Sequence, residues 1–124
     1  MSLRLVGLVL EVTDIGRSIV FYRDFLQFKL SAEQTWEGHK MAFLEDEAVE
    51  ITLLEQPHQG ETPGSAQLGA GVMVHLAVDN IETQMRRLMQ AQARFVRALE
   101  EAPWGGRTFV AADPDGYNIM FTGP

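Results

Sequence analysis

The sequence contains 124 residues, of which 46% are hydrophobic and 22% are charged, as is usual for one soluble globular domain. Its formal net charge of −7 argues against nucleic acid and anionic membranes as partners, because these are bound through clustered Lys and Arg. The absence of cysteine excludes disulfides, thiolate metal sites and a cysteine nucleophile. With no apolar run of about 18 residues and no recognisable signal peptide, the sequence predicts a cytoplasmic protein.

The first half of the chain predicts a strand, an amphipathic helix and three further strands. Residues 3–12 form a β-rich run, and Thr13 or Asp14 follows as the expected N-cap of the helix. Apolar residues then recur at helical spacing over about three turns, at Ile15, Ile19, Tyr22, Phe25 and Leu26. Short β-favouring runs between turn-like Gly and acidic residues predict strands at 29–34, 39–45 and 48–56.

A segment rich in Gly, Pro, Ser, Gln and Glu, residues 57–70, is the expected linker, and the same order of elements follows it. Residues 72–79 predict a strand, and Asn80 is the expected N-cap of a second helix. The apolar stripe of that helix is expected at Ile81, Met85, Leu88 and Met89. Further strands are predicted at 94–99, 108–111 and 117–121. The last two flank Asp113-Pro114-Asp115-Gly116, whose residue types are typical of a type I turn, so they should form a hairpin.

The two halves are related by a shift of 66 residues. This shift places Gly7 on Met73, Leu8 on Val74, Leu10 on Leu76, Val12 on Val78 and Ile15 on Ile81. The halves are therefore predicted to be two βαβββ modules, residues 3–56 and 71–122, of a single α+β domain. In each module the helix covers one face of the four-stranded sheet. The other faces of two such curved sheets can cup a groove lined by alternate strand residues, and there we expect a ligand.

Five short motifs in this order resemble the glyoxalase, bleomycin-resistance and extradiol dioxygenase superfamily, also called vicinal oxygen chelate proteins. They are Val12-Thr13-Asp14, Phe21-Tyr22, Val78-Asp79-Asn80, Trp104-Gly105-Gly106-Arg107 and Asp113-Pro114-Asp115-Gly116. The resemblance covers nearly the whole chain. It implies the cupped fold of two βαβββ modules and a homodimer with one groove per subunit. It also implies a divalent metal held by His, Gln or Glu from the first and last strands of each module, acting as a Lewis acid.

The four positions that the resemblance assigns to metal ligands are mostly not ligands in this sequence. They are Gly7, Glu50, Met73 and Met120, so that only Glu50 keeps an oxygen donor. Glycine has no side chain and a thioether prefers soft metals, so we expect no metal and no other cofactor. Glutathione-dependent glyoxalases carry a basic residue four positions past the first ligand. The residue here is Glu11, which argues against activity on a glutathione adduct.

Three polar residues are candidates for ligand contact, each with a simpler alternative. Glu50 is either a carboxylate inside the groove or a solvent-facing strand residue. His75 shares the parity of Met73, and could bind the ligand, act as a general base or join Glu50 and Glu11 in a displaced metal site; otherwise it is hydrogen-bonded to a neighbour. Arg107 either contacts the ligand or forms an ion pair within the hairpin.

The remaining candidates are apolar. Met73 and Met120 either pack in the core or give the groove a soft, apolar lining. Trp36 and Trp104 flank turns at strand ends, where each either stacks on a flat or cationic ligand or caps the core.

The sequence thus predicts a protein that binds a small molecule, similar in kind to bleomycin-type resistance proteins, rather than an enzyme. An aromatic and acidic groove favours a flat, neutral or cationic ligand. The first alternative is a metal-dependent lyase or dioxygenase with an atypical site that uses Glu50 and His75. The second is an interaction module that binds no small molecule.

Overall fold

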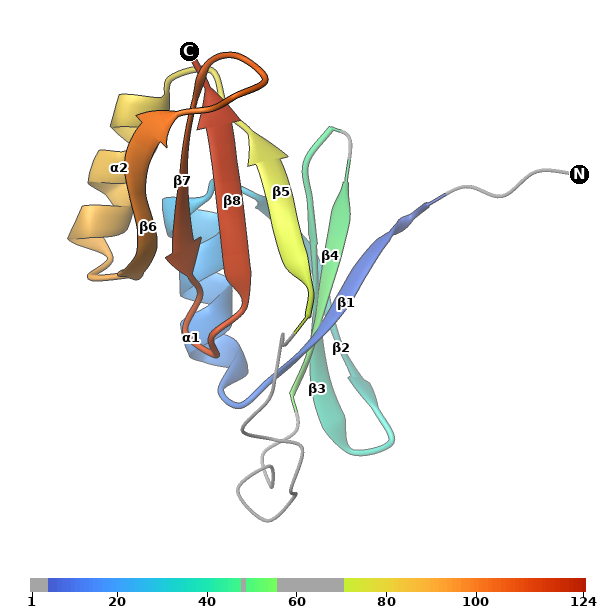
Figure 1. Ribbon diagram of the computed structural model, residues 1–124. Helices are drawn as coiled ribbons and strands as arrows, with labels where there is room; N and C mark the ends of the chain where they lie inside the picture. Colours follow the sequence, from blue (N-terminus) through green and yellow to red (C-terminus); the bar gives the residue numbers. More distant parts are fainter. Residues whose placement is uncertain (1–4, 48, 56–70) are drawn as a thin grey trace, which may run out of the picture. The chain divides into compact units, whose positions relative to one another are not determined.

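The computed structural model describes residues 5–47, 49–55 and 71–124 (Figure 1). It divides the chain into two compact units, Met1–Ala66 and Gln67–Pro124, and each contains a four-stranded mixed sheet with a helical segment. The predicted α+β fold with two βαβββ sheets is therefore confirmed. The predicted linker, residues 57–70, lies outside the described residues. Within the described part of the chain, no helix has both the length and the apolar character needed to cross a membrane.

The first unit has the strand order β1-β4-β3-β2, with β1 parallel to β4 and the other pairs antiparallel. Its strands are β1 (Gly7–Val12), β2 (Lys29–Trp36), β3 (His39–Glu45) and β4 (Glu50–Glu55). Helix α1 (Ile15–Ile19) packs against β3 and β4. It begins at Asp14, whose side chain accepts a hydrogen bond of 3.1 Å from the backbone N–H of Arg17, so that Asp14 and not Thr13 is the N-cap.

The three regular helical turns predicted from residue 15 onward are replaced after α1 by a π-helical segment, Val20–Phe25. Its wide turns are visible in the backbone bonds, since Leu26 donates to the carbonyl of Phe21 and Phe28 donates to that of Tyr22. The segment buries Phe21 and Tyr22 side by side, with their rings edge to face at 5.2 Å. Helical spacing predicted burial of Tyr22, Phe25 and Leu26, whereas the π-helical segment buries Phe21 and Tyr22 and leaves Phe25 and Leu26 half-buried.

The second unit repeats the topology, with the strand order β5-β8-β7-β6 and β5 parallel to β8 (Figure 1). Its strands are β5 (Met73–Ala77), β6 (Arg94–Glu101), β7 (Arg107–Ala112) and β8 (Asn118–Gly123). Helix α2 (Ile81–Gln90) packs against β7 and β8, with Ile81 and Leu88 fully buried. As predicted, Asn80 is the N-cap, and its side chain accepts from the backbone N–H of Thr83 at 3.0 Å.

The predicted hairpin joins β7 to β8 through Asp113-Pro114-Asp115-Gly116. Gly116 donates to the carbonyl of Asp113 at 3.0 Å and has a φ of 95°, which favours glycine. The buried Asp113 side chain accepts from the backbone N–H groups of Asp115 and Tyr117, both at 2.9 Å. One carboxylate oxygen thus satisfies two backbone donors and fixes the turn.

Candidate functional site

The second sheet has one face covered by α2 and a second face that α2 does not cover, here called the open face, and cross-strand pairing assigns residues to each. Arg107, Phe109 and Ala111 alternate onto the face that α2 covers, since Arg107 pairs with Glu82 of that helix. Residues that lie directly opposite each other on neighbouring strands project to the same side of a sheet. The open face is therefore made of Thr108, Val110 and the residues paired with them across the sheet. Its members on the four strands are Met73, His75, Ala77, Asn118, Met120, Thr122, Thr108, Val110, Ala112, Arg94, Arg97 and Glu100.

Strand β6 is irregular at the place where it supplies charged residues to the open face. Its register against β7 shifts twice, between Phe95 and Arg97 and between Arg97 and Glu100. In a regular strand Arg97 would point to the opposite face from Glu100, because side chains alternate. The two bulges instead pair Arg97 with Val110 and Glu100 with Thr108, which places both charges on the open face.

A pocket of about 410 Å³ lies within the second unit and is lined mainly by residues of this face and of the Pro103–Trp104 loop. Three predicted candidates line it, Met73, Trp104 and Met120. Trp104 is 62% exposed and Met73 47% exposed, so both side chains present apolar area to solvent beside the pocket. The other lining residues are Arg97, Glu100, Glu101, Pro103, Thr108, Phe109 and Val110. The volume falls within the range of about 300–1,000 Å³ that is usual for small-molecule sites.

The polar groups of the lining differ in how far they are already engaged. The hydroxyl of Thr108 is buried and donates to the backbone carbonyl of Phe121 at 2.9 Å, so its proton is not offered to a ligand. Arg97 and Glu100 form an ion pair of 2.7 Å, but their side chains are 65% and 49% exposed. An exposed pair of this kind contributes little stability and rearranges readily, so these two charges are accessible to a ligand.

His75 lies on the same open face but is not part of the pocket lining. It is exposed, stands opposite Met120 in the strand register, and its Nε2 is 3.1 Å from the hydroxyl oxygen of Thr122. A histidine bonded to a neighbouring residue is the simpler of the alternatives considered for this position. Asn118, next to Met73, has a buried Oδ1 with no hydrogen-bond partner among the described residues.

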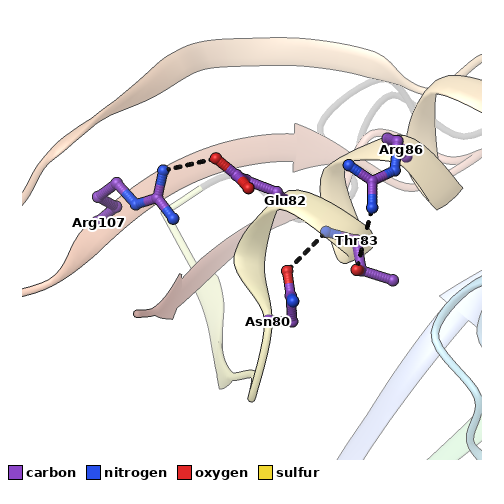
Figure 2. A network of polar contacts seen from close by, with 5 residues as sticks. All are labelled: Asn80, Glu82, Thr83, Arg86 and Arg107. Carbon is purple, nitrogen blue, oxygen red and sulfur yellow. Dashed lines mark hydrogen bonds and ion pairs between the residues drawn. The ribbon is translucent and has the colours of Figure 1, made fainter.

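Arg107 is directed away from the open face. Figure 2 shows its guanidinium paired with Glu82 of α2, where Nη1 and Oε2 are 3.0 Å apart. The partner is therefore on the helix and not within the hairpin. The same figure shows Arg86 of α2 donating to the hydroxyl of Thr83, at 3.3 Å, close to the Asn80 cap. The ion pair of Arg107 with Glu82 connects the start of α2 to β7, and the bond between Arg86 and Thr83 lies within the helix.

The other predicted candidates, Glu11, Trp36 and Glu50, belong to the first unit. All three lie on the face of the first sheet opposite α1, because the intervening residues of β1, Leu10 and Val12, are buried. Glu11 is exposed, Glu50 is half-buried and Trp36 is 54% exposed.

The metal-ligand positions implied by the resemblance do not fit a divalent ion. Gly7 is paired with Glu50 at the start of the parallel β1–β4 ladder, and a Cβ built on Gly7 would collide with the backbone carbonyl of Glu50. This position therefore excludes a side chain as well as lacking one. Met73 and Met120 offer thioethers, which are poor donors for Zn, Mg or Mn. In the described ranges, no three His, Cys, Asp or Glu side chains come together as a metal-binding group.

Several pocket residues were not among the candidates from sequence. Thr108 and Val110 follow from simple alternation along the strand that precedes the hairpin, which is a usable signal. Arg97 and Glu100 do not, because the two bulges of β6 leave no mark in the pattern of apolar and polar residues. Pro103 stands beside Trp104 in the loop and carries no separate signal.

Comparison with protein families gives one match along nearly the whole chain. The model of the Glyoxalase/Bleomycin resistance protein/Dioxygenase superfamily matches residues 4–121. A lactoylglutathione lyase of Salmonella typhimurium is 31% identical over 131 residues, covering 94% of this chain and 90% of that protein. A shorter match, 40% identical over 50 residues, covers 40% of this chain and spans only 33% of an uncharacterised protein of Mycobacterium bovis.

Two solved structures with the same fold carry different functional descriptions. A glyoxylase/bleomycin resistance protein/dioxygenase domain from Frankia sp. EAN1pec has a TM-score of 0.82 and 20% identity, and the match covers 98% of this chain and 93% of that one. TnmS3, an antibiotic binding protein from Streptomyces sp. CB03234, has a TM-score of 0.74 and 22% identity, with 100% and 98% covered. At such identities these likenesses show the fold alone.

Proposed function

Because this chain belongs to the Glyoxalase/Bleomycin resistance protein/Dioxygenase superfamily, we propose that it binds a small aromatic molecule in the pocket of its second sheet. The observation that carries the proposal is the lining of this pocket of about 410 Å³, to which Met73, Trp104 and Met120 contribute two thioethers and an indole. An indole face stacks on flat ligands, and thioether sulfurs make favourable contacts with aromatic rings. A fold neighbour described as an antibiotic binding protein is consistent with this role.

The pocket supports an aromatic body more directly than it supports a positive charge. The acidic residues from which a cationic ligand was expected, Glu11 and Glu50, are not part of its lining, and the carboxylates that are, Glu100 and Glu101, share the lining with the guanidinium of Arg97. The lining is mainly apolar, so burial of a flat ring there is favourable at roughly 25 cal/mol per Å². Binding alone, without chemistry, is the function that these residues support.

The proposal is tested by calorimetric titration with a flat, neutral probe such as 2-naphthamide. We expect measurable binding that Met120→Ala weakens about fivefold, because the variant removes one thioether from the lining. Met89→Ala is the matched control, since Met89 is an exposed residue of α2, which packs on the other face of the sheet. Equal affinities of both variants and the parent protein, or no binding at all, would contradict the proposal.

A metal-dependent lyase is the second candidate, favoured by the 31% identity to a lactoylglutathione lyase along most of both chains. The residues at the expected metal-ligand positions argue against this candidate, since Gly7 admits no side chain and two further positions, Met73 and Met120, are methionines. Elemental analysis after soaking in Zn, Ni, Mn or Fe(II) and desalting separates the candidates. One bound metal per chain that Glu50→Ala abolishes would establish the metalloprotein. We expect no stoichiometric metal.

A further inference from the structure

The charged edge of the pocket is the feature that the proposed function leaves unexplained. We infer that the ligand carries an anionic group, such as a carboxylate, which is held by Arg97 while its aromatic body lies on Met120 and Trp104. This inference rests on the proposed function and adds the charge of the ligand to it.

The first argument is the charge that the irregular strand brings to the open face. Register places Arg94 opposite Ala112, Arg97 opposite Val110 and Glu100 opposite Thr108, so β6 presents two positive charges and one negative charge to this face. A regular strand would have placed Val96 or Ala98 where Arg97 now stands, because side chains alternate along a strand. Bulges that redirect side chains are common beside functional sites. The double bulge thus brings Arg97, together with Glu100, to the edge of an otherwise apolar pocket; Glu101 also belongs to the lining, whereas Arg94 does not, so Arg97 is the cation of the lining.

The second argument is the hydrogen-bonding capacity of Arg97. Its guanidinium has five N–H donors, and the contact with Glu100 joins one nitrogen, Nη2, to one carboxylate oxygen at 2.7 Å. The side chain is 65% exposed, so its other donors can turn toward a ligand. A planar guanidinium fork matches a carboxylate in two parallel bonds, which are stronger than neutral hydrogen bonds.

Glu100 then acts as the internal competitor of the ligand's anion. It lines the pocket and forms the 2.7 Å ion pair with Arg97. An anionic ligand exchanges one carboxylate for another at the guanidinium, whereas a neutral ligand leaves the ion pair unchanged. Loss of the Glu100 charge should therefore strengthen binding of an anion selectively.

The experiment uses three probes with one skeleton, 2-naphthoate, 2-naphthamide and naphthalen-2-ylmethanamine, titrated calorimetrically at about 0.15 M salt so that the overall charge of −7 is screened. Location is read from the indole N–H resonance in a Trp36→Phe background, where Trp104 is the one remaining tryptophan of the two in the sequence. We expect all three probes to shift the Trp104 resonance. The naphthoate should bind about tenfold more tightly than the amide, and the ammonium compound most weakly.

Variants assign the preference to Arg97. Arg97→Gln should reduce naphthoate affinity to that of the amide, and Glu100→Gln should raise it without changing the amide. Arg86→Gln makes the same charge change on α2, where Arg86 bonds Thr83, and should have no effect. Equal affinities of the three probes, or tightest binding of the ammonium compound, with the Trp104 shift intact would overturn the inference and leave the proposed function standing. If no probe shifts Trp104, both fail together.

Discussion

The two sheets of this protein have the same strand order and the same N-capped helical start, yet they treat one equivalent position in opposite ways. Gly7 of β1 and Met73 of β5 are related by the repeat shift of 66 residues. In the first sheet the β1–β4 ladder is so close at Gly7 that no Cβ fits, whereas in the second sheet the Met73 side chain is 47% exposed and lines a pocket. A repeated fold thus fixes the backbone positions, and side-chain space at those positions decides what each unit can bind.

The largest expected effect comes from filling the position that admits no side chain. Gly7→Ala should lower the free energy of unfolding by up to about 3 kcal/mol, because the added methyl group meets the backbone carbonyl of Glu50. Chemical denaturation measures the change. Gly16→Ala is the control, since its Cβ would only approach the Asp14 side chain at an ordinary 3.5 Å within α1; it should stabilise by about 0.5–1 kcal/mol.

The reciprocal change completes this test. Met73→Ala, at the equivalent position of the second sheet, should cost less than about 1 kcal/mol because the side chain is half exposed, yet it should weaken binding of a flat probe. If Gly7→Ala leaves the free energy of unfolding unchanged, position 7 has room for a side chain after all. The two units would then differ at this position only in the residue that the sequence places there.

The second prediction concerns the turn of the β7–β8 hairpin, which closes the sheet that carries the pocket. Asp113→Ala should destabilise by about 2 kcal/mol, since the backbone N–H groups of Asp115 and Tyr117 lose their common acceptor in a buried setting. Asp113→Asn keeps an oxygen acceptor at this place and should cost clearly less. Thermal or denaturant unfolding of the two variants shows whether the loss of stability comes from the missing oxygen acceptor or from shortening the side chain.

The third prediction asks whether the two units behave as independent copies. Asp14→Ala and Asn80→Ala each remove a helix N-cap, with bonds of 3.1 and 3.0 Å to Arg17 and Thr83, and each should cost about 1 kcal/mol. Because each cap acts within its own sheet and helix, the double variant should equal the sum within about 0.5 kcal/mol. A larger deviation would show that the helix starts are energetically coupled.

Much of the fold was predictable because its signals are local. Alternation, turn residues and N-cap residues predicted all eight strands and both helix starts, and the 66-residue repeat predicted the shared topology. The π-helical segment was missed because the spacing of its apolar residues is typical of an α-helix; Tyr22 is buried as expected, but Phe21 is buried in addition and Phe25 and Leu26 are only half-buried.

The site was less predictable because it depends on register and not on composition. Met73, Trp104 and Met120 were among the candidates, and the structure brings them to one pocket. Arg97 and Glu100 were missed, since a bulge changes the face of a residue without changing its neighbours in sequence. The exclusion of a side chain at Gly7 likewise follows from the distance between two strands, which no motif encodes.

The smallest expected effect tests the one candidate that the second sheet directs to its helix-covered face. Arg107 and Glu82 are 36% and 55% exposed, so breaking their 3.0 Å ion pair should cost only about 0.2–1 kcal/mol. A double-mutant cycle of Arg107→Ala and Glu82→Ala should give a coupling energy in that range, reduced at high salt. Arg107→Ala should leave the affinity for a naphthalene probe unchanged, because the side chain points away from the pocket face. If Arg107→Ala instead weakens binding of the probe as much as Arg97→Gln does, Arg107 must leave Glu82 to contact the ligand. The division of the sheet into a helix-covered face and a binding face would then be wrong.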